Sequence, residues 1–254
     1  MCCLFLAASS TVAIAQTNVV DLVNPIIGTN GMGHTFPGAC VPFGLVQLSP
    51  DTDTIPHNVD GKYQPRSYEY CAGYQHKDSS IVGFSHTHFS GTGHSDLGDI
   101  LIMPTTGTLK LNPGTATNPD GGYRSRFSHG TEISRPGYYE VMLTDYGVKA
   151  QLTTTQRVGI HKYTYPTNSE NQRIILDMIH GIYNYDGKVL WTNIRVENDT
   201  LVTGYRITNG WARTNYTYFA MSFSKPITHY GCEEKAKVNY PASYTHLRAH
   251  ETGR

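Results

Sequence analysis

Short apolar runs that alternate with less apolar residues dominate the second half of this chain, and they constrain its fold more than any other feature. Tyr139, Val141 and Leu143 alternate with their neighbours, a turn follows at residues 145–147, and the alternation resumes through residues 148–152. Successive side chains of a strand point to opposite faces, so this pattern predicts an antiparallel hairpin.

Further segments of the same kind follow, separated by turns rich in Asn, Asp, Gly and Pro. They lie at residues 158–165, 173–178, 189–197, 200–208 and 217–223, and an earlier candidate lies at residues 41–50. No window has convincing helical periodicity. Many short strands at such spacing predict an all-β fold, a large antiparallel β-sandwich formed by one domain.

Composition and the N-terminal segment limit the classes of function. The chain has 254 residues, a formal net charge of zero and 16% charged residues, which argues against a nucleic-acid partner because such a partner needs a basic face. The apolar run at residues 1–12 is too short to span a bilayer and is followed by Ala13-Ile14-Ala15. This pattern predicts a signal peptide at residues 1–15 and export to the periplasm or the exterior, although no Lys or Arg precedes the run; the alternative is a buried first strand.

Without that segment, the chain has an odd number of cysteines, Cys40, Cys71 and Cys232, whose spacing is not that of a metal site. We expect small buried apolar side chains here. The alternative is one Cys40–Cys71 bridge, which an oxidising compartment would permit.

Residues 81–104 concentrate the groups that bind ligands. This central stretch contains three histidines, two aspartates and four glycines, and it begins and ends with short apolar runs that predict strands. The segment between them, residues 90–95, has the composition of a loop. Two strands that hold a glycine-rich polar loop form a rigid scaffold on which a site can be presented.

The same stretch carries a family resemblance. Gly83-Phe84-Ser85-His86-Thr87-His88 resembles a segment in the N-terminal domain of glycoside hydrolase family 92, a family of exo-acting α-mannosidases that are mostly bacterial and exported. Other similar segments are residues 24–29, 33–39, 42–44, 47–52, 90–93, 96–100, 145–150, 157–161, 204–206, 210–212 and 223–226. The similarity runs in order from about Val20 to about Pro226, so it is more specific than any single block.

This resemblance implies a two-domain glycosidase. The family joins a galactose-mutarotase-like β-supersandwich to a C-terminal (α/α)6 barrel, which holds the general acid Glu, the general base Asp and the calcium ligands. The implied reaction is inverting hydrolysis of α-mannosides such as those of N-glycans, with calcium as cofactor. We expect the sandwich at residues 20–240, an irregular tail at residues 241–254, and no catalytic residue in this chain, which alone would be inactive. Our hypothesis is that the last dozen residues are non-native sequence, and an ordinary disordered tail is the alternative.

The resemblance also implies contacts between this domain and the sugar. Tyr70 is the candidate stacking aromatic, because the family tends to place an aromatic before the segment matched by Cys71, Gly73 and Tyr74. The other expected substrate-binding residues are His86, His88, Asp96 and Asp51. A structural role is the alternative for each of them. Trp191 and Trp211 are expected on strands, as core or domain-interface residues rather than sugar platforms.

Two further alternatives remain open. If the strand continues through His86 and His88, both side chains point to one face, and with His94 and Asp96 or Asp99 they could bind zinc. Against this, calcium prefers oxygen ligands and the family holds it elsewhere, so no metal site is expected in this chain. The alternative function is a stand-alone carbohydrate-binding sandwich without hydrolytic activity.

Overall fold

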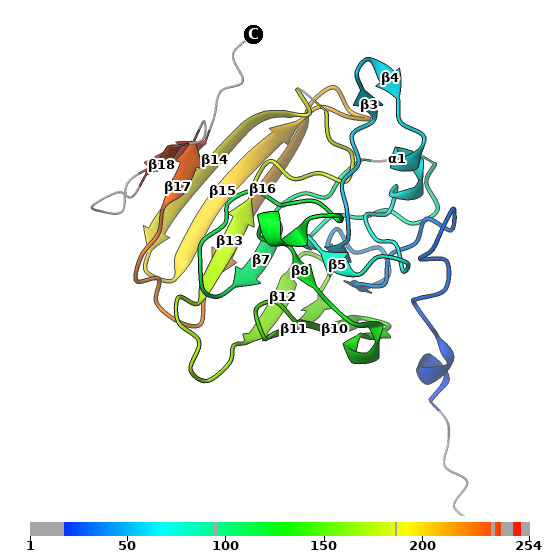
Figure 1. Cartoon of the computed structure of the whole chain (residues 1–254), viewed down its shortest axis with the longest axis horizontal. Coiled ribbons are helices and arrows are strands. Elements are labelled where there is room, and N and C mark those ends of the chain that lie inside the picture. Colours follow the sequence, from blue (N-terminus) through cyan, green and yellow to red (C-terminus); the bar gives the residue numbers. More distant parts are fainter. Residues whose placement is uncertain (1–17, 94–95, 186, 235–236, 240–245, 250–254) are drawn as a thin grey trace, which may run out of the picture.

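The protein is built almost entirely of antiparallel strands, as its computed structural model shows (Figure 1). The structure describes residues 18–93, 96–185, 187–234, 237–239 and 246–249, so the predicted signal peptide lies outside the described residues. Within them, the helical segments are η1 (Val19–Leu22), α1 (Arg66–Glu69), η2 (Pro119–Gly121) and η3 (His129–Thr131). The predicted all-β class is confirmed.

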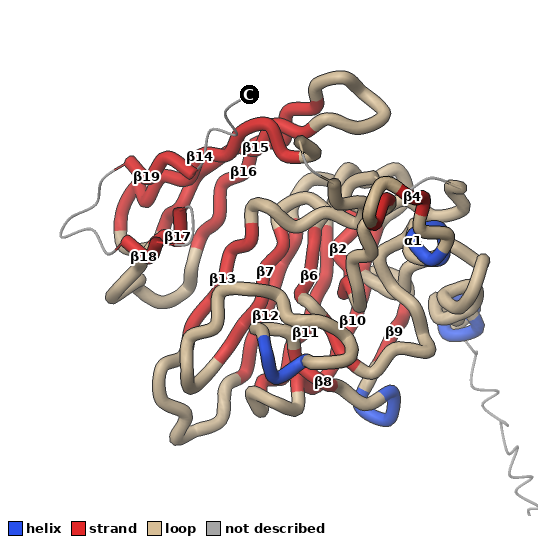
Figure 2. The backbone as a smooth tube through the Cα atoms, turned by 45° about the horizontal axis from the view of Figure 1, so that its top comes forward, coloured by secondary structure: helices blue, strands red, loops and turns tan. Residues whose placement is uncertain are grey.

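Three larger sheets form the body of the domain. The five-stranded sheet has the order β1 (Ala39–Cys40), β2 (Gln47–Asp51), β6 (Gly83–Ser85), β7 (Leu101–Thr105) and β13 (Arg173–Asp177). The second has the order β12 (Gly159–Thr164), β11 (Val148–Thr154), β10 (Tyr138–Leu143) and β9 (Ile133–Arg135). The third has the order β16 (Asn215–Ser222), β15 (Leu201–Thr208), β14 (Val189–Asn198) and β19 (His246–Ala249). In Figures 1 and 2 the second and third sheets lie on either side of the five-stranded sheet.

Three two-stranded ribbons complete the described structure. They pair β3 (Asn58–Val59) with β4 (Lys62–Tyr63), β5 (Ser80–Ile81) with β8 (Ser125–Arg126), and β17 (Cys232–Glu234) with β18 (Lys237–Asn239). The β5–β8 ribbon leads directly into the central stretch, because β6 begins two residues after Ile81.

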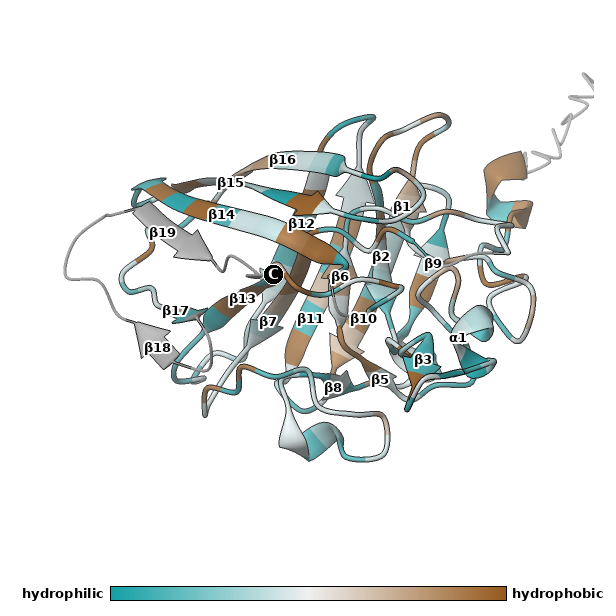
Figure 3. Cartoon of the chain, turned by 90° about the horizontal axis from the view of Figure 1, so that it is seen from above, coloured by the Kyte–Doolittle hydropathy of each residue, from teal (hydrophilic) through white to brown (hydrophobic). Residues whose placement is uncertain are grey.

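The main core lies between the five-stranded sheet and the β9–β12 sheet. Leu48, Phe84 and Leu101 from the first pack with Val141 and Ala150 from the second, and all five are completely buried. Burying one such large side chain contributes on the order of 1.5–3 kcal/mol, so these facing surfaces hold the two layers together. Apolar and polar segments alternate along strands such as β14 and β11 (Figure 3), as expected for strands with one buried face.

The strand predictions hold well in the second half of the chain. The predicted hairpin is β10 and β11, whose register places Tyr139 opposite Leu152 and Val141 opposite Ala150. The five segments predicted after it correspond to β12, β13, β14, β15 and β16. Most of these segments were predictable because a buried face imposes period-two alternation; β13 has no such alternation and was predicted from its apolar run.

Two strand predictions need correction. In the segment 41–50, the strand begins only at Gln47, because Val41 to Gly44 close a turn and Phe43 has a φ of 58°. A phenylalanine in the left-handed region cannot continue a strand. Trp211, predicted to lie on a strand, is instead in the loop between β15 and β16.

The cysteine and tail predictions have separate outcomes. Cys40, Cys71 and Cys232 are all free, so the alternative Cys40–Cys71 bridge is absent; Cys71 is buried, whereas Cys40 is exposed. The tail expected to be irregular contains strand β19, which pairs with β14. The remainder of residues 241–254 lies outside the described residues.

Candidate functional site

The central stretch leaves β6, forms a loop and returns as β7. Phe84 pairs with Ile102, which confirms that the stretch begins and ends as neighbouring strands. Backbone hydrogen bonds join His86 N to Asp99 O at 2.9 Å and Gly98 N to Thr87 O at 2.9 Å, so the two arms of the loop remain paired. The loop is therefore held from both sides.

Its return arm adopts an unusual backbone. Leu97, Gly98 and Ile100 have φ values of 73°, 76° and 57°. For a β-branched residue such as Ile100, this region costs on the order of 1–3 kcal/mol, so it persists only where the surroundings determine it. His86 contributes by donating from Nδ1 to the Ile100 carbonyl oxygen at 2.7 Å.

A completely buried carboxylate supports the loop from below. Asp51, the last residue of β2, accepts hydrogen bonds from His88 Nε2 at 2.8 Å on Oδ1, and from His180 Nε2 at 2.7 Å and Ser85 Oγ at 2.7 Å on Oδ2. Burial raises the pKa of Asp51, but the charge of His88 and the hydrogen bonds from His180 and His88 outweigh it, so this pKa lies well below its usual range. The carboxylate is ionised and accepts three hydrogen bonds.

The partners of His88 determine its protonation state. Its Nδ1 lies 2.7 Å from the Gln47 carbonyl oxygen, and its Nε2 lies 2.8 Å from the Asp51 carboxylate. Both partners can only accept, so both ring nitrogens must donate and the imidazole carries two protons. Asp51 and His88 are therefore a buried ion pair, with no exposed side-chain surface on either residue.

Two further ion pairs attach the loop to the third sheet. Asp99 accepts from Thr87 Oγ1 at 2.7 Å and lies 3.0 Å from Nε of Arg206, a buried residue of β15. Asp96 is paired with buried Lys188 and accepts the backbone N–H of Trp211 at 3.0 Å. Burial raises the pKa of Asp96, but hydrogen bonds from Lys188 and Trp211 lower it below its usual value, so Asp96 remains ionised.

A chain of neutral side chains flanks the loop on the side of β12. The Tyr163 hydroxyl lies 2.7 Å from His161 Nδ1, and His161 Nε2 lies 3.0 Å from His86 Nε2. Since His86 Nδ1 donates to a carbonyl, its Nε2 accepts from His161, and neither ring needs a second proton. Burial lowers the pKa of His86 to about 4, and burial together with His86 lowers the pKa of His161 well below its usual value.

His86 and His161 also line a hollow that is bounded by the five-stranded sheet, the third sheet and β12 of the second sheet. Its volume is about 2580 Å³. Pockets that enclose small ligands usually measure about 300–1,000 Å³. The hollow is thus an open gap between layers rather than a site shaped around one sugar.

The structure places the predicted site residues at different depths. Asp51, His88 and Tyr70 are buried, with relative exposures of 0%, 1% and 1%, and the Tyr70 hydroxyl donates to Asp78 at 2.9 Å. Asp96 and His86 are intermediate. Asp51 and His88 bond to each other and form the buried support of the loop. Asp96 and His86 bond to other partners, Lys188 and Ile100. Sugar contact by these five residues stays a prediction.

The zinc alternative gains no support from the histidine geometry. Both ring nitrogens of His86 bond toward Ile100 and His161, and both of His88 bond toward Gln47 and Asp51. With different partners at every nitrogen, the two rings do not converge on a common point. His94, the third proposed ligand, lies outside the described residues.

The accessible side chains around the loop are aromatic. Phe89 and Trp211 are 53% and 50% exposed, and their rings meet edge to face with centroids 5.9 Å apart. Tyr68, 38% exposed, lies against the loop, because a Cβ on Gly93 would be 2.8 Å from its hydroxyl. Aromatic faces with a few polar groups nearby are typical of small-ligand sites. We call Tyr68, Phe89 and Trp211 the aromatic rim.

Sequence reasoning missed these three residues. It selected Tyr70 rather than Tyr68, although only the latter is exposed. It treated Trp211 as a core or interface residue because it placed Trp211 on a strand. The available signal was adjacency, since Phe89 precedes Ser90-Gly91 and Trp211 follows Gly210. Asp96 fixes the latter loop, because a Cβ on Gly210 would lie 2.3 Å from Asp96 Oδ2.

The one candidate ion-binding group found among the described residues does not suit calcium. Among them, His76, His129 and Glu132 are the single group of His, Cys, Asp or Glu close enough to hold an ion together. Calcium takes six to eight oxygen ligands, whereas two of these three side chains offer nitrogen.

In the part of the chain that the structure describes, no helix is long and apolar enough to cross a membrane.

Comparisons with known proteins agree on one family. The model of the glycosyl hydrolase family 92 N-terminal domain matches residues 22–252. A family 92 α-mannosidase from Bacteroides thetaiotaomicron, solved in complex with mannoimidazole, is 40% identical with a TM-score of 0.81, and the match covers 92% of this chain and 29% of that one.

Two more distant relatives are similar over shorter shares of their length. An inverting family 92 mannosidase from Bacteroides thetaiotaomicron is 26% identical with a TM-score of 0.67, over 91% of this chain and 28% of that one. An uncharacterized secreted glycosidase of Arthroderma benhamiae is 28% identical over 170 residues, which are 63% of this chain and 19% of that protein. This chain thus spans less than a third of the length of these relatives. The family match extends over most of the sequence, so the chain belongs to glycosyl hydrolase family 92 and corresponds to its N-terminal domain.

Proposed function

We propose that this domain forms one wall of the sugar site in a secreted exo-α-mannosidase. The observation that carries the proposal is the aromatic rim, which surrounds the hydrogen-bonded central loop of a domain 40% identical to that of a family 92 α-mannosidase. Aromatic side chains bury large area with few rotatable bonds, so they recognise the apolar face of a pyranose at a small entropic cost.

The buried network beneath the loop supports this role by holding it in place. Asp51, His88 and Ser85 fix the start of the loop, while Asp96 holds the backbone of Trp211. A binding constellation must stay within about 0.5 Å of its productive geometry, and supporting hydrogen bonds provide that precision. We therefore assign Asp96 as a positioning residue and Phe89 and Trp211 as sugar-contacting residues.

The chemistry of the proposed enzyme requires groups outside this domain. Inverting hydrolysis uses one carboxylic acid to protonate the leaving oxygen and one carboxylate to activate water, about 6.5–9.5 Å apart. We propose that a C-terminal (α/α)6 barrel joined in cis supplies both groups and binds calcium through oxygen ligands. We also propose export, in keeping with the N-terminal segment and with the relative described as secreted.

The test is an activity assay on the enzyme that contains this domain joined to its helical domain. We expect cleavage of an aryl α-mannoside and no cleavage of the β-mannoside or α-glucoside. Phe89→Ala and Trp211→Ala should each lower kcat/KM about tenfold or more, which corresponds to about 1.4 kcal/mol of lost binding. Ile133→Ala, which alters another exposed apolar residue, on β9, should leave kcat/KM unchanged.

Three outcomes would oppose the proposal in distinguishable ways. Hydrolysis of α-mannosides with unaffected rim variants would remove the rim from the site. Failure to hydrolyse α-mannosides, with turnover of another glycoside, would refute the substrate class. Binding of mannoimidazole by the 254-residue chain alone, with no activity in any longer form, would favour the carbohydrate-binding alternative.

A further inference from the structure

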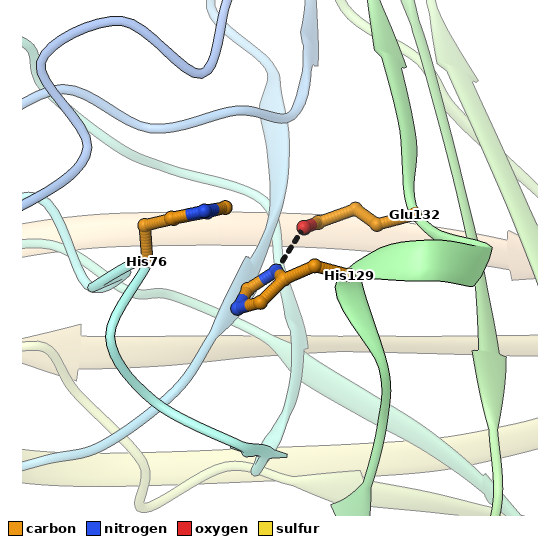
Figure 4. A group of neighbouring side chains, drawn as sticks. All are labelled: His76, His129 and Glu132. Atoms are coloured by element: carbon orange, nitrogen blue, oxygen red, sulfur yellow. Dashed lines mark hydrogen bonds and ion pairs between the residues drawn. The ribbon is translucent and has the colours of Figure 1, made fainter.

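Two histidines and a glutamate meet at the edge of the second sheet, apart from the central loop (Figure 4). His76 belongs to the segment before β5, His129 is the first residue of η3, and Glu132 follows η3 directly. Their possible ligand atoms all lie within 4.8 Å of one another. In Figure 4 the rings of His76 and His129 and the carboxylate of Glu132 point toward a common space.

The carboxylate of this group is already held in one orientation. The Glu132 side chain is 3% exposed and accepts hydrogen bonds from the hydroxyls of Tyr74 at 2.8 Å and Tyr139 at 2.6 Å. Metal-binding carboxylates are commonly fixed by such outer hydrogen bonds.

The two imidazoles are unusually close to each other. The ring centroids of His76 and His129 are 3.9 Å apart with an angle of 33° between the ring planes, and His129 Nδ1 lies 2.7 Å from Glu132 Oε2. A divalent ion would bind one nitrogen of each ring and balance the charge of Glu132.

The geometry points to a zinc site formed by His76, His129 and Glu132, with water as the fourth ligand. Zinc binds nitrogen and carboxylate oxygen in tetrahedral sites at about 2.0–2.2 Å, whereas calcium and magnesium prefer oxygen. The His129 side chain is 38% exposed, so it can rotate toward the ion and leaves room for water. Copper(II) would also bind such ligands and is an alternative occupant that the test can distinguish.

An ion at this position would join segments that are distant in sequence. The backbone N–H of His76 donates to Thr29 O at 2.8 Å, and Gln75 exchanges hydrogen bonds with the backbone of Gly31. On the other side, Tyr139 connects Glu132 to β10. We therefore assign the ion a stabilising role, in which it ties the loop around residues 29–31 to the second sheet.

The experiment is a thermal unfolding series on the full chain, first freed of metal and then titrated with zinc chloride. A ligand that binds only the native state at about a hundredfold excess over Kd should raise Tm by about 5–10 °C. His76→Ala, His129→Ala and Glu132→Gln should each weaken zinc binding about tenfold or more in calorimetric titration. Cobalt(II) added in place of zinc should give the visible absorption of a tetrahedral site in the wild type only.

His229→Ala is the matched control, because this histidine is exposed and outside the group. It should keep the full zinc-induced rise in Tm. The inference is overturned if His129→Ala shows the same rise as the wild type, if zinc leaves the wild type unchanged, or if calcium produces an equal rise. If copper(II) binds the same three residues more tightly than zinc does in a separate titration, that result would support the site, because copper(II) ordinarily binds such ligands more tightly than zinc.

Discussion

Replacing Asp51 by asparagine should destabilise the domain strongly. The carboxylate accepts from His88, His180 and Ser85 at 2.7–2.8 Å. An amide can accept at only one of its two ends, so in either orientation its NH2 group faces a donor. The substitution also leaves the charge of His88 buried without its partner.

The expected magnitude follows from that geometry. Breaking a buried ion pair by removing one partner costs about 3–5 kcal/mol, a large fraction of the stability of a typical domain. For a chain of this length each kcal/mol corresponds to about 2–4 °C, so Asp51→Asn should lower Tm by about 6–20 °C. The ion pair has no exposed side-chain surface, so salt should change this difference little.

Denaturant unfolding followed by circular dichroism measures this effect, with Asp120→Asn as the matched control. Asp120 pairs with Arg126 but is 73% exposed, so its loss should leave unfolding unchanged within error. A double-mutant cycle with His88→Gln should give a coupling energy of about 1 kcal/mol or more. Equal effects of Asp51→Asn and Asp120→Asn would refute the assignment of Asp51 as the centre of the scaffold.

Three other predictions concern the same domain. Gly73→Ala should lower the free energy of unfolding more than Gly61→Ala does. Both glycines have positive φ, but only a Cβ at Gly73 would clash with Asp51 Oδ1, at 2.2 Å. Equal losses of unfolding free energy would contradict this clash. Native His86 stays neutral down to about pH 4, whereas in the unfolded chain the same imidazole is protonated below about pH 6.5. Lowering the pH from 7 to 5 therefore favours the unfolded state and should reduce the free energy of unfolding by about 2 kcal/mol. His86→Gln should reduce that loss, and an unchanged pH dependence would show that His86 does not carry it. The 254-residue chain alone should not hydrolyse an aryl α-mannoside, and turnover comparable with that of a full enzyme would contradict the proposed division of labour.

The sequence predicted the strands of the fold better than it predicted which individual side chains are buried. Strands such as β10 and β11 were predictable because a buried face imposes alternation on the chain, as in Tyr139, Val141 and Leu143. Phe43 interrupted a predicted strand because its positive φ depends on the surrounding turn, which residue type alone does not specify. For the same reason, residue type alone does not predict where a strand begins or ends when a turn sets that position.

Burial of polar residues was the main obstacle at the site. Asp51 and His88 have the composition of ligand-binding residues, and only the tertiary structure reveals that they satisfy each other inside the sheet. Tyr68 and Tyr70 are two positions apart and differ in exposure, because a short helix rather than a strand carries the first. The central stretch begins and ends as paired strands, as its apolar runs predicted, but the exposure of its individual side chains could not be predicted from residue type.

The most direct test is a crystal structure of the complete enzyme with mannoimidazole bound. We expect Phe89 or Trp211 to lie within about 4–4.5 Å of the sugar ring, the distance of van der Waals contact. We also expect the Asp51–His88 pair to remain intact beneath them. A sugar bound with no atom of residues 89–93 or Trp211 in contact would contradict the claim that this domain forms a wall of the site.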